Sequence, residues 1–522
     1  MKIILFAILT FSGISISAQQ KEAYIIGGSN TNIANSMVQT SDGGYAITGY
    51  TNSFGRGNIT VYVVKVDSNI NLQWGKTIGG ASTDEGDYII QTRDKGYAVC
   101  GTTSSYGRGD FDAYLIKLDS LGNLTWTRTI GGGRTDGANS VVQTTDGGYA
   151  LTGWTVSYGK DSLVGDNVYI IKLDSLGILQ WTKTVGGTGG EDIGASIKQT
   201  RDGGYIVAGW TNSFGAGGYD CYVLRLDGSG NLLWTKTIGG SKYEQAYCII
   251  QTNDKGFAFC GQTNSFADTN GDVYVVKLDS AGNMDWTRTI GGPHGAAGVS
   301  IIQTKDKGFV VCGNTGADDS VNGDVYVLKL DSIGNLLWTQ TTGGRGIDYS
   351  NQVVQSKNGG FAVIGNTNSY ASGYKMYLIL LDSLGNSCSP NPTGGSIDSG
   401  AIIGQGGFVS EGGKQDTGGV VHTGGAVKAI CPDDGINKIN IPIPGTIVYP
   451  TPASKEVTFK INSGENKYLE LSDITGREME TLPIFNNEIR VNISGFPAGI
   501  YFYEIMNNSA NIVDRGKFSV AK

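Results

Sequence analysis

The stretch Lys117-Leu-Asp-Ser-Leu-Gly-Asn-Leu-Thr-Trp-Thr-Arg-Thr-Ile-Gly-Gly132 decides how this chain folds, because it recurs with small changes along most of the sequence. Its tryptophan returns at steps of 52, 55, 53, 52 and 52 residues, as Trp74, Trp126, Trp181, Trp234, Trp286 and Trp338. A second marker, Gly-Tyr or Gly-Phe, ends at Tyr45, Tyr97, Tyr149, Tyr205, Phe257, Phe309 and Phe361. A fixed period of roughly 50 residues is typical of propellers and solenoids.

Each copy contains four short segments that are rich in aromatic and β-branched residues. In the second copy they span residues 88–92, 97–102, 113–118 and 124–130, and Gly, Asp and Asn separate them. These features indicate strands joined by tight turns, and no long segment has the 3.6-residue apolar period of a helix. Four antiparallel strands per copy predict one propeller blade. The sequence therefore predicts an all-β protein with a seven-bladed β-propeller of four-stranded blades.

The two ends of the array complement each other. Near Ser389, where the seventh tryptophan would fall, the chain reads Ser-Pro-Asn-Pro, so this copy lacks its fourth strand. At the other end, residues 22–26 precede the first full copy, and Ile26-Gly-Gly28 lies 52 residues before Ile78-Gly-Gly80, which follows a fourth strand. We expect this N-terminal strand to complete the last blade and to close the ring over residues 19–389, because closure removes exposed edges.

Composition limits the class of protein. The 522 residues include 82 Gly and only two His, and the net charge is −8. This charge argues against nucleic acid and against an anionic membrane surface as partners. We expect a monomeric propeller with no nucleic-acid partner.

A separate signal occupies residues 1–18. Lys2 precedes an apolar run over residues 3–14, and Ser-Ile-Ser-Ala18 follows. A basic start, an apolar run of about 7–15 residues and a small residue at the cut are typical of a secretory signal peptide, whereas a membrane anchor needs about 20 apolar residues. We therefore expect export through the inner membrane and cleavage after Ala18.

Export permits disulfides, and seven cysteines leave at least one unpaired within the chain. Cys388 and Cys431 flank a Gly-rich segment and are the best candidate pair. Cys248 and Cys260 would lie opposite each other if their two strands form the predicted hairpin. A bridge between them is the less favoured alternative.

Residues 390–441 carry a finer repeat of six residues. Its first glycines are Gly394, Gly400, Gly406, Gly412, Gly418 and Gly424. Such hexads can form a small β-roll or a run of short hairpins, and a flexible Gly-rich linker is the competing interpretation. The Val, Ile and Phe at regular places favour partial order, with the segment docked on the propeller.

The last part of the chain, residues 442–522, has alternating strands without a helical pattern and predicts a small β-sandwich. It contains the motifs Tyr-Pro-x-Pro-Ala, Asp-x-x-Gly-Arg, Pro-Ala-Gly-Ile-Tyr and a final Lys-Phe strand. The matching residues are Tyr449, Pro450, Pro452, Gly476, Arg477, Pro497, Ala498, Gly499, Tyr501 and Lys517. This part resembles the C-terminal sorting domain of type IX secretion, although Thr451 stands where that family usually has Asn.

The resemblance implies that the secretion machinery of a Gram-negative cell is a partner of this domain. The chain would then reach the outer surface or the medium. The propeller repeat itself resembles the repeats of secreted bacterial propellers with Asp-Gly-Gly-Tyr and Leu-Asp-Ser-x-Gly-Asn-Leu-x-Trp motifs. It is also similar to the Trp-bearing repeat of quinoprotein propellers, but the likeness brings no catalytic residues with it.

Function is expected where the copies differ. The loops after the second and fourth strands share one face, and they are longer and more varied than the turns on the other face. Long variable loops on a rigid scaffold are the usual place for binding. The residue after the second-strand Gly is aromatic at Tyr50, Trp154 and Trp210. These rings could stack on sugars, and packing between blades is the alternative.

Acidic residues precede or open the first strand in five copies: Asp84, Asp136, Asp192, Glu244 and Asp348. They would approach the mouth of the channel as ligand-binding carboxylates, or they would only cap the Gly-rich loops. Part of a Ca²⁺-loop pattern occurs at Asp268, Asn270 and Asp272, but the distal Glu is missing. Ca²⁺ is thus the one cofactor that the sequence leaves open, and no other metal site is expected.

No Gly-x-Ser-x-Gly, His-Glu-x-x-His or phosphate-binding loop occurs in the sequence. We therefore favour a propeller that binds polysaccharide or protein, as an adhesin or capture module, over an enzyme. Two alternatives stay open: a polysaccharide-degrading enzyme with carboxylates at the channel mouth, and a structural envelope protein.

Overall fold

The computed structural model describes two compact units, which divide between Asp434 and Gly435. The described residues are 22–55, 58–159, 165–267, 270–291, 295–316, 323–386, 396–398, 402–404, 408–410, 414–416, 420–423, 427–430, 447–449, 455–460, 467–473, 477–484, 488–507 and 512–520. Every regular element among them is a β-strand. No helix in this part of the chain is long and apolar enough to cross a membrane.

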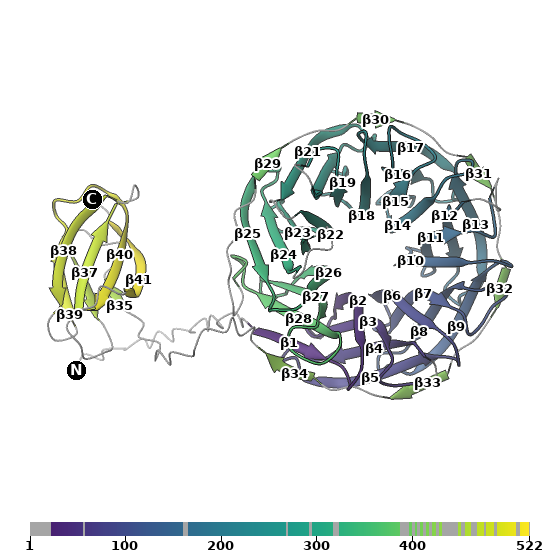
Figure 1. Cartoon of the computed structure of the whole chain (residues 1–522), viewed down its shortest axis with the longest axis horizontal. Coiled ribbons are helices and arrows are strands. Elements are labelled where there is room, and N and C mark those ends of the chain that lie inside the picture. The colour runs from purple at the N-terminus through teal and green to yellow at the C-terminus, as the bar shows by residue number, and fades with distance from the viewer. Residues whose placement is uncertain are drawn as a thin grey trace, which may run out of the picture. The chain divides into compact units, whose positions relative to one another are not determined.

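Seven antiparallel sheets form a ring (Figure 1). Blade 1 consists of β2 (Asn32–Gln39), β3 (Tyr45–Thr51), β4 (Thr60–Val66) and β5 (Leu72–Gly79). Blade 2 consists of β6 (Asp84–Gln91), β7 (Tyr97–Thr103), β8 (Asp112–Leu118) and β9 (Leu124–Gly131). Blade 3 consists of β10 (Asp136–Gln143), β11 (Tyr149–Thr155), β12 (Asn167–Leu173) and β13 (Leu179–Gly186). Blade 4 consists of β14 (Asp192–Gln199), β15 (Tyr205–Thr211), β16 (Asp220–Leu226) and β17 (Leu232–Gly239).

Blade 5 consists of β18 (Glu244–Gln251), β19 (Phe257–Thr263), β20 (Asp272–Leu278) and β21 (Met284–Gly291). Blade 6 consists of β22 (Ala296–Gln303), β23 (Phe309–Thr315), β24 (Val325–Leu330) and β25 (Leu336–Thr342). Blade 7 combines β26 (Asp348–Gln355), β27 (Phe361–Thr367) and β28 (Lys375–Leu381) with β1 (Glu22–Ile26). β1 pairs with β28 in antiparallel register from Glu22↔Leu380 to Ile26↔Met376. The predicted all-β propeller, closed by the N-terminal strand, is therefore confirmed.

The repeated tryptophan packs each blade against the next. Trp74 of β5 meets Tyr97 of blade 2 edge-on, with ring centroids 5.6 Å apart. On its other side the indole lies against Gly122, where an added Cβ would come within 2.9 Å of Trp74. The same Trp–Tyr or Trp–Phe contact recurs at the five following interfaces. The period of the sequence is therefore the period of blade packing.

The Asp that opens each turn between the third and fourth strands holds that turn together. Asp119 Oδ1 accepts hydrogen bonds from the backbone N–H of Leu121 and Asn123, both at 2.8 Å. Its Oδ2 accepts one from Asn123 Nδ2 at 2.9 Å. This geometry supports a turn-capping role for the repeated Asp.

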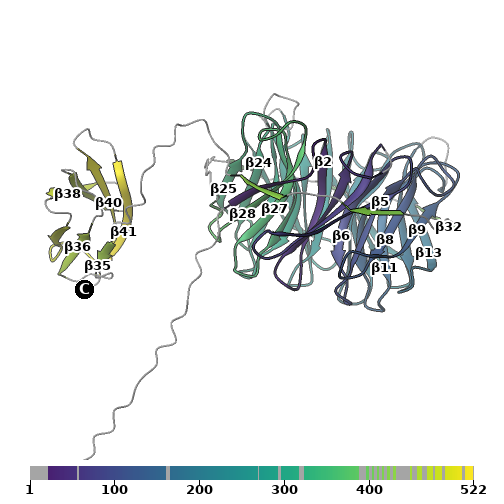
Figure 2. The ribbon, with the colours of Figure 1, turned by 90° about the horizontal axis from the view of Figure 1, so that it is seen from below.

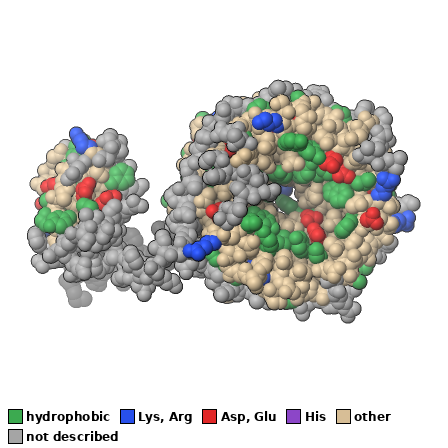
Figure 3. Space-filling view, viewed as in Figure 1, with side chains coloured by type: hydrophobic (Ala, Val, Ile, Leu, Met, Phe, Trp, Pro, Cys, Tyr) green, Lys and Arg blue, Asp and Glu red, His purple; other side chains and the backbone are tan. Residues whose placement is uncertain are grey.

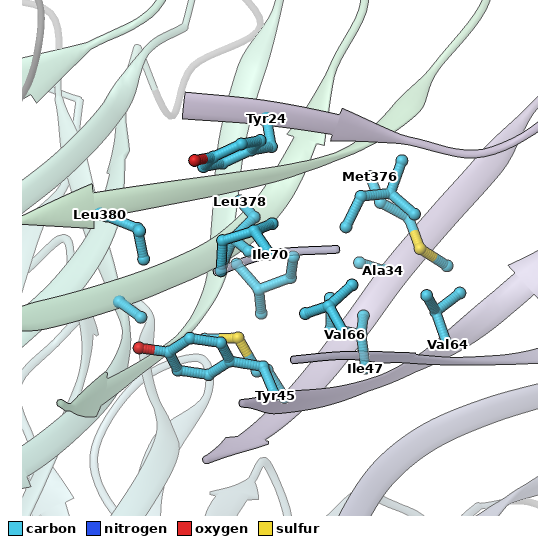
Figure 4. Packing of buried hydrophobic residues seen from close by; sticks show 14 of the residues in the cluster. Tyr24, Ala34, Tyr45, Ile47, Val64, Val66, Ile70, Met376, Leu378 and Leu380 are labelled. Carbon is cyan, nitrogen blue, oxygen red and sulfur yellow. The ribbon is translucent and has the colours of Figure 1, made fainter. Parts of the chain in front are cut away.

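The interface between blades 7 and 1, which we call the seam, is packed differently. β1 has no tryptophan, and Ile70 stands in blade 1 where Gly122 stands in blade 2. Ile70 has a left-handed backbone (φ 63°) and is 3% exposed. Its side chain joins the cluster that contains Tyr24, Tyr45 and Leu378 (Figure 4). Ile70 thus replaces part of the apolar volume that an indole supplies at the other interfaces.

The seam also lacks a charged pair that the other six blades have. Lys117 of β8 is 7% exposed and bonds Asp94 of its own blade at 2.8 Å, and equivalent pairs occur in blades 1, 3, 4, 5 and 6. In blade 7 the two positions are Leu380 and Asn358. A cavity of about 320 Å³ lies there, lined in part by Tyr45, Leu380 and Asn358.

Six short strands line the outer edges of the blades, and we call them the belt. They are β29 (Ser396–Asp398), β30 (Ile402–Gly404), β31 (Phe408–Ser410), β32 (Lys414–Asp416), β33 (Val420–Thr423) and β34 (Val427–Ile430). In this order they pair antiparallel with β21, β17, β13, β9, β5 and β1. Figures 1 and 2 show them on the outside of the ring. One six-residue repeat therefore adds a fifth strand to one blade.

The second unit is a small β-sandwich. One sheet contains β35 (Ile447–Tyr449), β36 (Glu456–Lys460) and β39 (Glu488–Asn492), and the other contains β38 (Glu478–Ile484), β37 (Lys467–Ser472), β40 (Gly499–Asn507) and β41 (Ile512–Val520). Phe459 lies 5.1 Å from Tyr503 and 5.6 Å from Phe518 between ring centroids, so residues of both sheets form one core. This agrees with the predicted fold of the tail.

Candidate functional site: the channel mouth

The first strand of every blade lines the channel (Figure 1). In each of them a β-bulge follows the third residue, and the extra residue is half-buried. Three of these extra residues are Asn side chains that bond the next blade: Asn35 to Gly86 O at 3.1 Å, Asn139 to Gly194 O at 3.1 Å and Asn351 to Ala34 O at 2.6 Å. The bulge positions therefore lie at the channel wall between neighbouring blades.

Blade 2 has an acidic residue at this position. Burial and the neighbouring Glu85 carboxylate raise the pKa of Asp87 to about 7, although Asn35 Nδ2 donates to its Oδ1 at 3.2 Å. Burial also raises the pKa of Glu85. Burial, Glu85 and Asp87 together raise the pKa of Tyr50 in blade 1. Tyr50 and the two carboxyl groups therefore lie close together, and no salt bridge involves either acid among the described residues.

Aromatic rings surround the rest of this mouth. Tyr349 of blade 7 meets Tyr374 at 5.9 Å between centroids, and burial followed by the nearby Tyr50 raises the pKa of Tyr349. Trp210 of blade 4 meets Tyr247 of blade 5 edge-on at 5.8 Å. On the face shown in Figure 3, hydrophobic side chains surround the central hollow and acidic side chains lie among them. We call Tyr50, Glu85, Asp87, Trp210, Tyr247 and Tyr349 the channel mouth.

A second aromatic pair lies on the loops beside blades 4 and 5. Tyr219 and Tyr243 have ring centroids 5.8 Å apart, and Tyr243 is 56% exposed. The Tyr219 hydroxyl donates to the Glu191 carboxylate. This pair places two further aromatic rings on the loops beside blades 4 and 5.

The three predicted aromatic residues are all half-buried on this side of the propeller. Trp154 covers Gly137, its partner on the neighbouring strand, where an added Cβ would lie 2.7 Å from the indole. Trp210 packs against Tyr247 of the next blade. Tyr50 is beside the acidic pair. Tyr50 and Trp210 are therefore part of the channel mouth, and Trp154 occupies the equivalent position in blade 3.

The five predicted carboxylates lie inside the blades. Asp84, Asp136, Asp192, Glu244 and Asp348 are all 0% exposed. Asp84 Oδ2 accepts hydrogen bonds from Ser105 Oγ and Gly80 N, both at 2.7 Å, and Thr103 donates to Oδ1. Equivalent bonds hold the other four. Because these carboxylates cap the Gly-rich loops and face no solvent, the channel mouth does not include them.

Deeper in the channel, side chains from three blades meet. Lys198 of blade 4 donates to the hydroxyl of Tyr88 in blade 2 at 3.1 Å, and Gln352 Nε2 of blade 7 donates to the same oxygen at 3.3 Å. These contacts join the first strands of blades 2, 4 and 7.

Asp268, the first residue of the predicted Ca²⁺ pattern, lies outside the described residues. The other two, Asn270 and Asp272, flank Gly271 at the start of β20. No group of three or more His, Cys, Asp and Glu side chains suits a metal ion in the part of the chain that the structure describes. Cys388 and Cys431 also lie outside the described residues. Cys248 is directly opposite Cys260, as expected, and both thiols are free.

Several residues of the predicted sorting motif make contacts within the second unit. The Tyr501 hydroxyl donates to the carbonyl of Pro497 at 2.9 Å, and its ring is 4% exposed. Arg477 Nε bonds Asp473 at 3.0 Å. Tyr449 lies in β35, Lys517 lies in β41, and Ala498 precedes Gly499 at the start of β40. Pro450, Pro452 and Gly476 lie outside the described residues.

Sequence reasoning missed Glu85, Asp87, Tyr247 and Tyr349. A signal for them exists within the repeats: the second and fourth residues of the first strand differ from copy to copy, whereas the residues around them stay similar. Variation confined to channel-facing positions of a regular scaffold points to a binding surface as directly as variable loops do.

Comparison with known proteins decides the nature of the tail. Residues 447–517 match the family described as "Secretion system C-terminal sorting domain". The C-terminal unit is a type IX secretion sorting domain. This sorting domain implies engagement with the type IX machinery and export to the cell surface or the medium.

The propeller has weaker similarities. The regulatory protein FlaEY of Caulobacter vibrioides is 28% identical over 115 residues, which are 20% of this chain and only 12% of that protein. The structure of Sqt1 from Chaetomium thermophilum has 12% identity and a TM-score of 0.39 over 67% of this chain and 83% of that one. PorZ, a surface component of the type IX system of Porphyromonas gingivalis, has 9% identity and a TM-score of 0.26 over 94% and 81%.

Proposed function

We propose that the propeller of this type IX cargo is a polysaccharide-binding module and that its site is the channel mouth. The observation that carries the proposal is the combination, at one mouth, of half-buried aromatic rings with two carboxyl groups that have no cationic partner among the described residues. Aromatic faces present apolar surface of fixed shape to the C–H faces of sugars. Carboxylates accept hydrogen bonds from hydroxyl groups and fix the orientation of a ligand.

The distribution of these groups around the ring favours an extended ligand. Trp210 and Tyr247 belong to blades 4 and 5, whereas Tyr50, Glu85 and Tyr349 belong to blades 1, 2 and 7. Tyr219 and Tyr243, of which Tyr243 is 56% exposed, place two further rings on the loops beside blades 4 and 5. A glycan chain of several residues could contact both sides of the mouth, which a single sugar could not.

The test is a glycan array probed with the exported full-length chain and with Trp210→Ala and Tyr247→Ala. We expect each variant to lose about tenfold or more in affinity for the glycans that the parent binds, because each removes half of one aromatic pair. Tyr468→Ala is the matched control, because Tyr468 is 44% exposed and lies in the sorting domain. Absence of any glycan signal from the parent, with binding to a protein instead, would reject the polysaccharide.

A second candidate function, cleavage of the polysaccharide, is favoured by one observation. A carboxyl group with a pKa of about 7 beside a second carboxyl is suited to act as a general acid. The discriminating variant is Asp87→Asn. If the mouth cleaves its ligand, this variant keeps binding and releases no reducing ends; if it only binds, the parent releases none either.

A further inference from the structure

The seam between blades 7 and 1 is where several stabilising features of the ring are missing together. It lacks the interblade indole and the buried Lys–Asp pair, and it contains the left-handed Ile70. A cavity of about 320 Å³ lies at the seam. We expect a ring with six regular interfaces and one irregular one to open first at the irregular one.

Blade 7 is also the blade whose fourth strand is not continuous with the third. In blades 1 to 6 a short turn joins these strands, as between β8 and β9, and the Asp cap stabilises that turn. β1 comes from the other end of the array and is held in blade 7 by its five residue pairs with β28. With no covalent hairpin, separation of β1 from β28 is not limited by a turn.

The belt ends on this strand. Its strands begin at residues 396, 402, 408, 414, 420 and 427, and each pairs with the next blade around the ring. Six extended residues reach about 20 Å, which fits the step from one blade edge to the next. The final strand β34 pairs with β1 through four residues, from Ala23↔Ile430 to Ile26↔Val427. β1 is therefore enclosed between β28 and β34.

We propose that the belt is a latch for the seam: β34 holds β1 in blade 7 and thereby keeps the ring of the exported protein closed. On blades 1 to 5 a belt strand covers an edge that a hairpin already secures. On blade 7 it converts a separate edge strand into an interior strand, which must break two ladders to leave. The latch is distinct from the channel mouth and does not depend on the proposed ligand.

The first test breaks one belt strand at a time by proline, which removes a donor from the ladder. Lys428→Pro with Ala429→Pro disrupts β34, and Val421→Pro with His422→Pro disrupts β33, a strand of the same length on blade 1. Hydrogen exchange is followed in the strand that each one covers. We expect exchange in β1 to rise at least tenfold in the first variant and exchange in β5 to rise less than threefold in the second.

Equal increases of hydrogen exchange in β1 and β5 would mean that the belt only covers blade edges in general. Unchanged exchange in β1 would reject the latch.

If the proline variants do not fold, cross-linking gives the reciprocal test. Ile26→Cys with Val427→Cys joins paired positions at the seam, and Ile78→Cys with Val421→Cys joins the equivalent positions on blade 1. Oxidation should raise the unfolding midpoint of the first variant more than that of the second, and a reductant should abolish the difference. Equal shifts would again reject the latch.

Discussion

At the scale of single residues, Asp87 has the most informative charge in the propeller. Its pKa is about 7 in the folded chain, well above the ordinary value of an aspartate side chain, because burial and the neighbouring Glu85 disfavour the charged form. Well below pH 4 the carboxyl is protonated in both the folded and the unfolded chain and does not destabilise the fold. As the pH rises from about 4 to about 7, the unfolded chain ionises this group whereas burial and Glu85 keep it protonated in the folded chain, so stability is lost across this window and the loss is complete above pH 7.

We therefore expect Asp87→Asn to be more stable than the parent above pH 7, by about 1–3 kcal/mol. The difference should fade as the pH falls toward 4. Urea unfolding followed by tryptophan fluorescence measures it, because all eight tryptophans lie in the propeller. A variant that is less stable than the parent at pH 8 would contradict the assignment.

Ile70 illustrates how a locally unfavourable residue can be favoured by its surroundings. A β-branched residue in the left-handed region is strained by roughly 1–3 kcal/mol, and six other copies have Gly at this position. Ile70→Gly relieves the strain but removes a side chain that is 3% exposed, whose loss leaves a void. We expect a net loss of about 1–3 kcal/mol in chemical unfolding.

The reciprocal change Gly122→Ile is the control for this prediction. Its Cβ would lie 2.9 Å from Trp74, so the loss should be larger than that for Ile70→Gly. A stabilising effect of Ile70→Gly would show that Ile70 does not substitute for the missing indole.

At the scale of elements, the Lys–Asp pair links the first turn of a blade to its third strand. Lys117 is 7% exposed whereas Asp94 is 61% exposed, so loss of the Asp leaves a buried ammonium group without its counterion. Asp94→Asn should lower stability by about 1–3 kcal/mol. Addition of Lys117→Leu should recover most of that loss, because blade 7 folds with Leu380 and Asn358 at these positions.

A double-mutant cycle in urea measures the coupling. The outcome that would contradict the pairing is additivity, with the double variant as unstable as the sum of the two single variants. The same cycle for Lys172 and Asp146 in blade 3, which are 2.8 Å apart, should give a similar coupling.

At the scale of the whole molecule, the sorting domain determines where the propeller acts. Removal of residues 435–522 deletes one compact unit and leaves the other whole. We expect the truncated chain to fold and to remain in the periplasm, and protease treatment of intact cells followed by immunoblotting measures the surface fraction. Full-length Trp210→Ala should reach the surface normally. Surface display of the truncated chain would contradict the role of the sorting domain.

The sequence alone determined the blade count, the order of strands, the closing role of residues 22–26 and the nature of the tail. These features follow from local patterns, since strand alternation, turn residues and a fixed period are all readable along one dimension. The positions of Tyr50 and Trp210 on the varied face could be inferred in the same way, because equivalent positions of repeated blades point in equivalent directions.

Only the tertiary structure decided which groups meet. Asp84 and its four equivalents look like surface acids in the sequence, but they are buried, with hydrogen bonds from Thr and Ser side chains about twenty residues away and from a backbone N–H close by in the chain. Asp87 and Tyr50 come together because β6 of blade 2 packs beside β3 of blade 1. The pairing of each six-residue repeat with the next blade likewise depends on the spacing between neighbouring blade edges in the ring. Such distances depend on the curvature of the closed assembly, which no single repeat contains.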